Sequence, residues 1–116
     1  MQKYSLQSRT NVLLYIYTKR GGAMLPVKAD VICLHTKDGN VVPLRIRVAD
    51  EDGLLQAYSI KEYRDVSHQG ARTMPDGLVV TNNTLNFECK IVVFGQEKRV
   101  RLYSNPPYLE WKMTHQ

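Results

Sequence analysis

Cysteine is scarce in this chain, with two among 116 residues. Two cysteines are too few for the disulfide scaffold that holds many small secreted domains together. Cys33 and Cys89 both lie in apolar stretches, where a thiol usually serves as a small hydrophobic side chain. We therefore expect a cytoplasmic protein whose cysteines are reduced.

Long hydrophobic runs are also missing. The longest, residues 12–17, is far shorter than the roughly 20 residues needed to cross a bilayer. It is followed by Thr-Lys-Arg-Gly-Gly rather than by a small-residue cleavage site, so the sequence predicts no secretory signal. We expect no membrane partner.

The motifs of metal, cofactor and nucleophile sites are absent as well. The histidines and cysteines form no Cys-x-x-Cys or His-x-x-x-His spacing, the acidic turn 50–53 lacks the alternating ligands of a calcium loop, and no glycine-rich phosphate loop is present. Asp65, Ser67 and His68 form a local nucleophile, base and carboxylate grouping, but no nucleophile-bearing turn surrounds them. We expect no metal, no cofactor and no enzymatic activity.

The net charge of +5 comes from 16 basic and 11 acidic residues, and most of the excess lies at the amino terminus. Residues 1–23 contain Lys3, Arg9, Lys19 and Arg20 and no acidic residue. Residues 24–116 are nearly balanced, and a balanced domain lacks the overall electrostatic footprint of a nucleic-acid-binding protein.

Residues 1–23 form a basic tail that precedes a single predicted domain, residues 24–116. Residues 19–23 can be encoded by codons containing a ribosome-binding sequence just upstream of Met24. One interpretation is that Met24 is the physiological start and residues 1–23 are a translated leader. The other is an ordinary tail in which the β-prone run 12–17 adds an edge strand or pairs with another molecule.

From about residue 28 the sequence alternates short β-prone stretches with turn signals such as Asp38-Gly39. In the stretch 41–48, a period of two places Val42, Leu44, Ile46 and Val48 on one face and Pro43 and the arginines on the other. Pro43 lacks an amide donor, so we expect an edge or an irregularity there. The predicted strands are 29–36, 41–48, 54–60, 78–81, 84–94, 99–104 and 108–113, with Phe87, Cys89, Ile91, Val93, Val100 and Leu102 facing inward and Leu109, Trp111 and Met113 in phase.

Residues 61–77 show no sustained periodicity and end in the turn signal Pro-Asp-Gly, so we predict a long loop with an optional helical turn at 60–65. Loops of this length are frequently functional. The candidate binding residues in it are Tyr63, Arg64, His68, Arg72 and Met74.

Six to seven short strands without a long helical period predict an all-β fold. Hairpins closing into a small antiparallel barrel, SH3-like or OB-like, would hide the sheet edges, and we favour this arrangement. A two-sheet sandwich is the alternative, because strand order is invisible to periodicity.

The most distinctive surface feature is a repeated Arg-x-Arg, which places each pair of arginines on one face of a predicted strand. If the two strands are neighbours, four arginines line one sheet and two tyrosines flank them as stacking surfaces, as in single-strand nucleic-acid binders. Alternatively, Glu88 or Glu110 pairs with the arginines across strands. The candidate binding residues of this face are Arg45, Arg47, Arg99, Arg101, Tyr58 and Tyr103.

A protein-binding patch is a further interpretation of the same region. Outward-facing Phe94 and Tyr103, with Tyr63 and Met74 in or beside the long loop, are residue types enriched at protein interfaces.

Over about residues 30–113 the chain resembles small single-domain β proteins of Gram-positive bacteria to which no function is assigned. The stretches Pro-Leu-Arg-Ile-Arg at 43–47, Asp-Glu-Asp-Gly at 50–53 and Phe-Glu-Cys-Lys-Ile at 87–91 carry the resemblance. It implies a bacterial cytoplasmic origin and supplies no activity. We expect a small non-enzymatic binding or accessory module with an unknown protein partner, and a nucleic-acid-binding module as the alternative.

Overall fold

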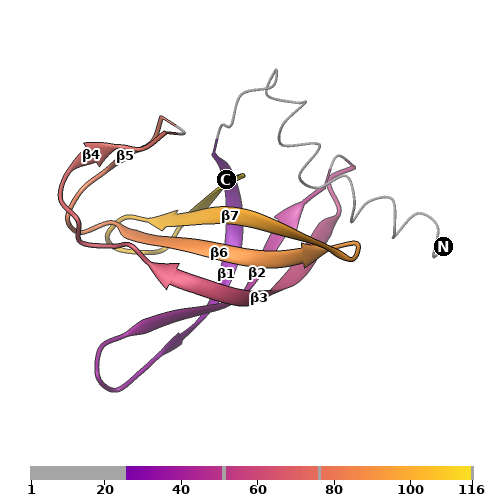
Figure 1. Ribbon diagram of the computed structural model, residues 1–116, viewed down its shortest axis with the longest axis horizontal. Helices are drawn as coiled ribbons and strands as arrows, with labels where there is room; N and C mark the ends of the chain where they lie inside the picture. The colour runs from indigo at the N-terminus through magenta and orange to yellow at the C-terminus, as the bar shows by residue number, and fades with distance from the viewer. Residues whose placement is uncertain (1–25, 51, 76, 116) are drawn as a thin grey trace.

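The structure is a computed structural model that describes residues 26–50, 52–75 and 77–115. The basic tail and its β-prone run 12–17 lie outside the described residues. The strands are β1 (Val27–His35), β2 (Val41–Ala49), β3 (Leu55–Asp65), β4 (Arg72–Thr73), β5 (Val79–Val80), β6 (Leu85–Val93), β7 (Gln96–Ser104) and β8 (Trp111–His115) (Figure 1).

Six of these strands form a closed antiparallel barrel in the order β1-β2-β3-β6-β7-β8. Each strand pairs with the next barrel strand along the chain, and pairing of β8 with β1 closes the circle. The predicted all-β small antiparallel barrel is confirmed, and the sandwich alternative is wrong. In the described residues, no helix is found that has the length and apolar character to cross a membrane.

Alternating side chains fill the barrel as the sequence predicts for β6 and β7. Their inward residues are joined in one core by Ile46 and Val48 of β2, Tyr58 of β3 and Met113 of β8. The predicted phase of the last strand is wrong at Leu109, which precedes β8 and is 83% exposed. The core of β6 and β7 is Phe87, Cys89, Ile91, Val93, Val100 and Leu102.

The phase of β2 changes at a β-bulge. The pairing of β1 with β2 shifts register between Ile32 and Cys33, so that Cys33 lies opposite Pro43 and Leu44 is the extra residue. Pro43 is buried and Leu44 is 43% exposed, so the predicted inward Leu44 is wrong. The predicted irregularity at Pro43 is confirmed, and the paired residues of β2 with β3 begin at Arg45.

Part of the predicted long loop is regular strand. Residues 61–65 continue β3, which pairs with β2 as far as Ser59 and with β6 from Ile60 onward, so the optional helical turn is wrong. A register shift between Ile60 and Glu62 accompanies the change of partner. Strand β3 is long because its first part pairs with β2 and its second part pairs with β6.

Residues 66–71 of that stretch are a loop, and the β4–β5 hairpin that follows lies beside the end of β7 (Figure 1). Its turn is closed by Gly77, whose N–H donates to the Met74 carbonyl at 2.9 Å. Met74 and Val80 pack on Tyr103 of β7 in a second, smaller core. The hairpin thus covers a residue that strand alternation points outward.

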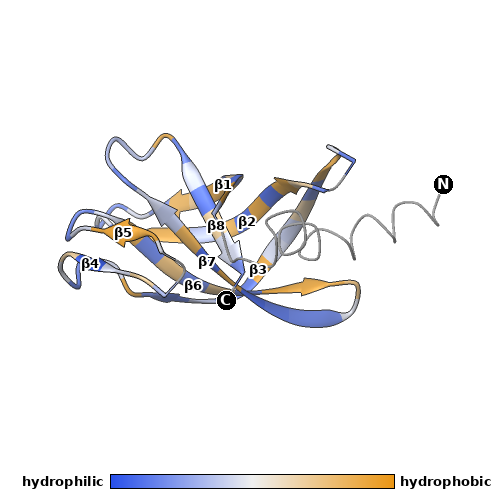
Figure 2. Ribbon diagram, turned by 90° about the horizontal axis from the view of Figure 1, so that it is seen from above, coloured by the Kyte–Doolittle hydropathy of each residue, from blue (hydrophilic) through white to orange (hydrophobic). Residues whose placement is uncertain are grey.

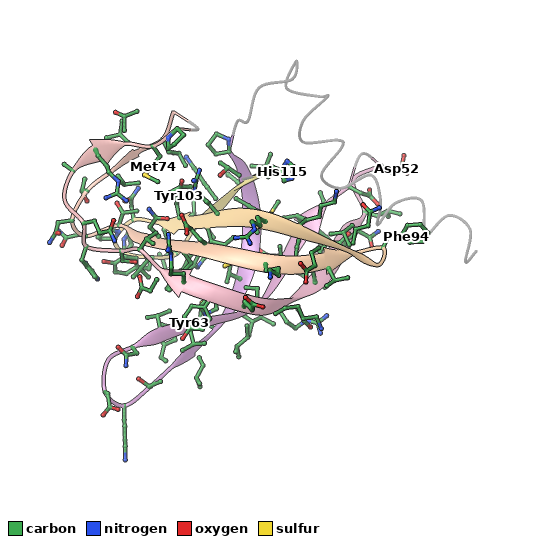
Figure 3. All side chains as sticks on the ribbon, in the orientation of Figure 1. Asp52, Tyr63, Met74, Phe94, Tyr103 and His115 are labelled. Carbon is green, nitrogen blue, oxygen red and sulfur yellow. The ribbon has the colours of Figure 1, made fainter. Side chains whose placement is uncertain are left out.

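The antiparallel order gives the barrel two ends. At the loop end lie the connections 36–40, 66–84 and 105–110. At the turn end lie the short connections 50–54 and Phe94–Gly95, together with the start of β1 and the end of β8. Figure 3 shows Met74 and Phe94 at opposite ends. The predicted protein-binding patch that joined these two residues is therefore wrong.

Candidate binding site at the mouth of the barrel

The two Arg-x-Arg pairs do not share a surface. Strands β2 and β7 are separated by β3 and β6 in one direction and by β1 and β8 in the other. Arg45 and Arg99 are both exposed, on opposite sides of the barrel. The expectation of four arginines on one sheet required neighbouring strands, so it is wrong.

Cross-strand ion pairs engage the other two arginines. Arg47 of β2 binds Asp30 of β1, with Nη2 at 2.7 Å and Nε at 2.9 Å from Oδ2. Arg101 Nε lies 3.9 Å from Glu88 Oε2, while Arg64 Nη2 lies 2.8 Å from Glu88 Oε1. The predicted pairing with Glu88 is confirmed. These arginines stabilise the outer face of the barrel modestly.

The two tyrosines expected beside the arginines are buried. Tyr58 is 6% exposed because its position on β3 faces the core, opposite Ile46. Tyr103 is 3% exposed because the β4–β5 hairpin covers it. Neither presents a stacking surface, so this part of the prediction is wrong.

The candidate residues of the long loop are dispersed. Tyr63 and Arg64 lie on β3, where the Tyr63 ring packs edge-on against Phe87 with ring centroids 6.0 Å apart. Arg72 of β4 donates from Nε to Met74 Sδ and from Nη1 to the Gln69 carbonyl, each at 3.3 Å. Met74 is buried, and His68 alone of this set lines a cavity at the loop end of the barrel.

A cavity of about 490 Å³ opens at the loop end of the barrel; we call it the mouth. Strands β1 and β2 contribute apolar side chains to one wall, and β6, β8 and the loops contribute the other. This volume lies within the range of small-molecule sites, which frequently occupy barrel mouths. The lining residues are Val31, Cys33, His35, Gly39, Val41, His68, Leu85, Tyr108 and Trp111.

Two residues of the mouth have left-handed backbones, His68 with φ 61° and Tyr108 with φ 65°. The side chains of both residues bind the main-chain carbonyls of one turn. His68 Nδ1 lies 2.6 Å from the carbonyl oxygen of Asn82, and Tyr108 Oη donates to the carbonyl oxygen of Asn83 at 2.7 Å. Left-handed backbone is costly for non-glycine residues and persists where surrounding contacts impose it. Three loops are thus tied together at the rim.

The hydrogen bond at His68 fixes its tautomer. A carbonyl oxygen can only accept, so Nδ1 carries the proton that it donates to Asn82. In the neutral ring, Nε2 is consequently an acceptor.

Cys33 lines the mouth as an apolar side chain and not as a nucleophile. Burial raises the pKa of its thiol, which keeps it protonated at neutral pH. The pKa of the Cys89 thiol is raised to about 12, mainly by burial and then by the charges of Cys33 and Glu88. Both thiols behave as small apolar groups.

The local grouping of Asp65, Ser67 and His68 does not assemble as a triad. The Asp65 carboxylate accepts from the Ser67 N–H at 2.9 Å, while Ser67 Oγ accepts from the Asn86 N–H at 2.8 Å. His68 Nδ1 is bound to the Asn82 carbonyl instead. Across the described ranges, no cluster of three His, Cys, Asp or Glu side chains could hold a metal ion.

Sequence reasoning located His68 but missed the rest of the mouth. Val31, Leu85 and Trp111 come from three strands that meet only when the barrel closes, and each resembles an ordinary core residue in its own segment. The single Trp directly after an irregular, proline-containing stretch was the one local signal.

Comparison with protein-family models, curated proteins and solved structures finds no match to this chain.

Proposed function

We propose that this protein is a non-enzymatic binding module whose mouth accepts an uncharged aromatic group of its ligand. The observation that carries the proposal is the mouth itself, a cavity of about 490 Å³ with apolar walls and four planar side chains. Tyr108, Trp111, His35 and His68 supply faces and edges for ring packing.

The chemistry of the lining favours an uncharged group. Among the described residues that line the mouth there is no Asp, Glu, Lys or Arg. A charged group would lose its hydration there without gaining a counter-charge, which is strongly unfavourable. An aromatic ring gains by leaving water, at about 25 cal/mol for each Å² of apolar surface buried.

One polar feature favours a ring that carries a hydroxyl. His68 donates from Nδ1 to Asn82, so its neutral ring offers Nε2 as an acceptor at the wall. A phenolic O–H is a suitable donor for this atom. The nucleic-acid alternative relied on four arginines sharing one face, and the strand order separates the two arginine pairs.

The test uses p-cresol, the side-chain analogue of tyrosine, titrated into the full chain. We expect a dissociation constant on the order of 1 mM, as is typical for so small a fragment. NMR shifts should concentrate on the methyl groups of Val31, Val41 and Leu85, and the fluorescence of Trp111, the single tryptophan, should change in parallel.

A matched pair of variants separates the mouth from general hydrophobic binding. Val41→Phe fills the mouth and should abolish the p-cresol shifts, whereas Val79→Phe, on the exposed face of β5, should leave them unchanged. His68→Ala should weaken p-cresol binding more than toluene binding, because toluene has no hydroxyl. Shifts scattered over the surface, or unaffected by Val41→Phe, would contradict the proposal.

A further inference from the structure

The barrel wall opens near the turn end, between β3 and β6. Residues Leu55 to Ser59 of β3 pair with β2, and pairing of β3 with β6 begins at Ile60 and Ile91. Beyond Ile91, β6 pairs with β7 alone. Figure 2 shows the β2–β3 and β6–β7 hairpins diverging at this point. Two strand edges therefore border the opening.

Hydrogen-bond alternation shows which β3 groups face the opening. The Asp50 N–H donates to the Leu54 carbonyl at 2.8 Å, and these two residues are opposite one another in the β2–β3 register. In an antiparallel pair every second residue turns its N–H and C=O toward the partner strand. Leu55, Ala57 and Ser59 consequently direct theirs away from β2.

On the opposite rim, the main-chain N–H and C=O of Val92 also face the opening. The β6–β7 loop is a two-residue turn with positive φ at Phe94 (50°) and Gly95 (78°), which is the type I′ arrangement. The pair flanking such a turn, Val93 and Gln96, is hydrogen-bonded, so the main chain of Val92 points away from β7.

A groove of about 810 Å³ lies between these two edges. Val92 and Phe94 on its rim are exposed, Phe94 by 55%. Lys61 is the one charged side chain among the described lining residues. The lining is Ala57, Tyr58, Ser59, Lys61, Val92, Phe94 and Gly95.

We propose that this groove binds an extended segment of a partner protein, which adds as a strand to the edge of β3 and places a carboxylate near Lys61. A row of main-chain donors and acceptors at every second residue matches the repeat of an added strand. Exposed edges are normally blocked by charge, proline or covering loops, whereas this edge is bordered by the apolar Val92 and Phe94. The site lies at the other end of the barrel from the mouth and is independent of the function proposed there.

The probe is an acetylated, amidated hexapeptide of alternating valine and threonine in which one threonine is replaced by glutamate. Titrated into the full chain, it should slow amide hydrogen exchange at Leu55, Ala57 and Ser59 severalfold. The same peptide N-methylated at alternate residues keeps its side chains but cannot pair through its backbone, so it should give no protection. Equal protection by both peptides would overturn the proposal.

Two variants, both on β3, test the backbone pairing and the charge of the groove separately. Ala57→Pro removes an N–H that faces the groove and that β2 does not use, so it should abolish peptide binding. Lys61→Gln should weaken the glutamate peptide at least threefold and leave its glutamine counterpart unchanged. Leu55, Ala57 and Ser59 amides already protected before peptide is added, or protected increasingly at higher protein concentration, would assign the groove to this chain or a second copy and overturn the proposal.

Discussion

At the scale of single residues, the left-handed backbone is informative. Among the described residues other than glycine, positive φ occurs at His68, Phe94 and Tyr108. The first and last line the mouth, and Phe94 borders the β3–β6 groove. Such conformations cost about 1 kcal/mol or more, so their position at the two proposed binding surfaces fits selection for function at the expense of stability.

A substitution at Phe94 tests whether its backbone conformation lowers the stability of the protein. Asparagine tolerates the left-handed conformation better than phenylalanine and favours type I′ turns, so Phe94→Asn should raise the free energy of unfolding by about 1 kcal/mol. Urea denaturation measures the change. Gly95→Ala, at φ 78°, should lower the stability and serves as the control. A lower stability for Phe94→Asn would show that the exposed ring stabilises the native barrel.

His115 makes stability depend on pH. Burial, and next the charge of Lys98, lowers the pKa of its imidazole below the ordinary value of 6.5. The folded protein therefore binds this proton less readily than the unfolded chain, so the contribution is complete above about pH 6.5 and is lost as pH falls below it. We expect unfolding free energy to decline from pH 7 to pH 5, and His115→Gln to reduce that slope. An NMR titration midpoint at or above 6.5 would refute the argument.

At the scale of elements, the β4–β5 hairpin depends on a small core of its own. Met74 and Val80 pack on Tyr103, apart from the main core. The hairpin should consequently open without unfolding the barrel.

Met74→Ala tests this local stability. Loss of the buried side chain should cost about 2 kcal/mol and accelerate amide exchange in β4 and β5 roughly thirtyfold. Exchange in β6 and β7 should be unchanged. Val79→Ala, on the exposed side of the same hairpin, is the matched control. Equal acceleration throughout the barrel would mean that the hairpin and the barrel unfold as one unit.

Alternation predicted the inward residues of β6 and β7 because each strand keeps one phase along its length. It failed at Leu44, where a bulge shifts the phase, and in residues 61–65, where β3 exchanges one neighbour for another. Both features depend on pairing between distant segments. Periodicity within one segment contains no information about its partner.

The site predictions failed for the same reason. Tyr103 points away from the barrel as expected, yet a hairpin from elsewhere in the chain buries it. Arg45 and Arg99 are exposed as predicted, but strand order separates them. The mouth is assembled from residues of four strands and three connections, so no local motif identifies it.

At the scale of the whole molecule, the barrel is closed by its shortest pairing. Strands β1 and β8 are matched at Val27 with Met113, Lys28 with Lys112, and Ala29 with Trp111. The middle pair sets two exposed lysines directly opposite one another. Like charges in this arrangement repel, so the closing pair of strands carries an unfavourable contact.

Lys28→Glu should convert that repulsion into an attraction and raise the free energy of unfolding by about 0.5 kcal/mol at low salt. Because both side chains are exposed, added salt screens the pair, and the gain should shrink as ionic strength rises. Urea denaturation at 20 mM and 500 mM salt measures both effects. The double variant Lys28→Glu, Lys112→Glu restores a like-charged pair and should lose the gain. If Lys28→Glu leaves stability unchanged at both salt concentrations, the two side chains avoid each other in solution and the closure of the barrel does not depend on their charge.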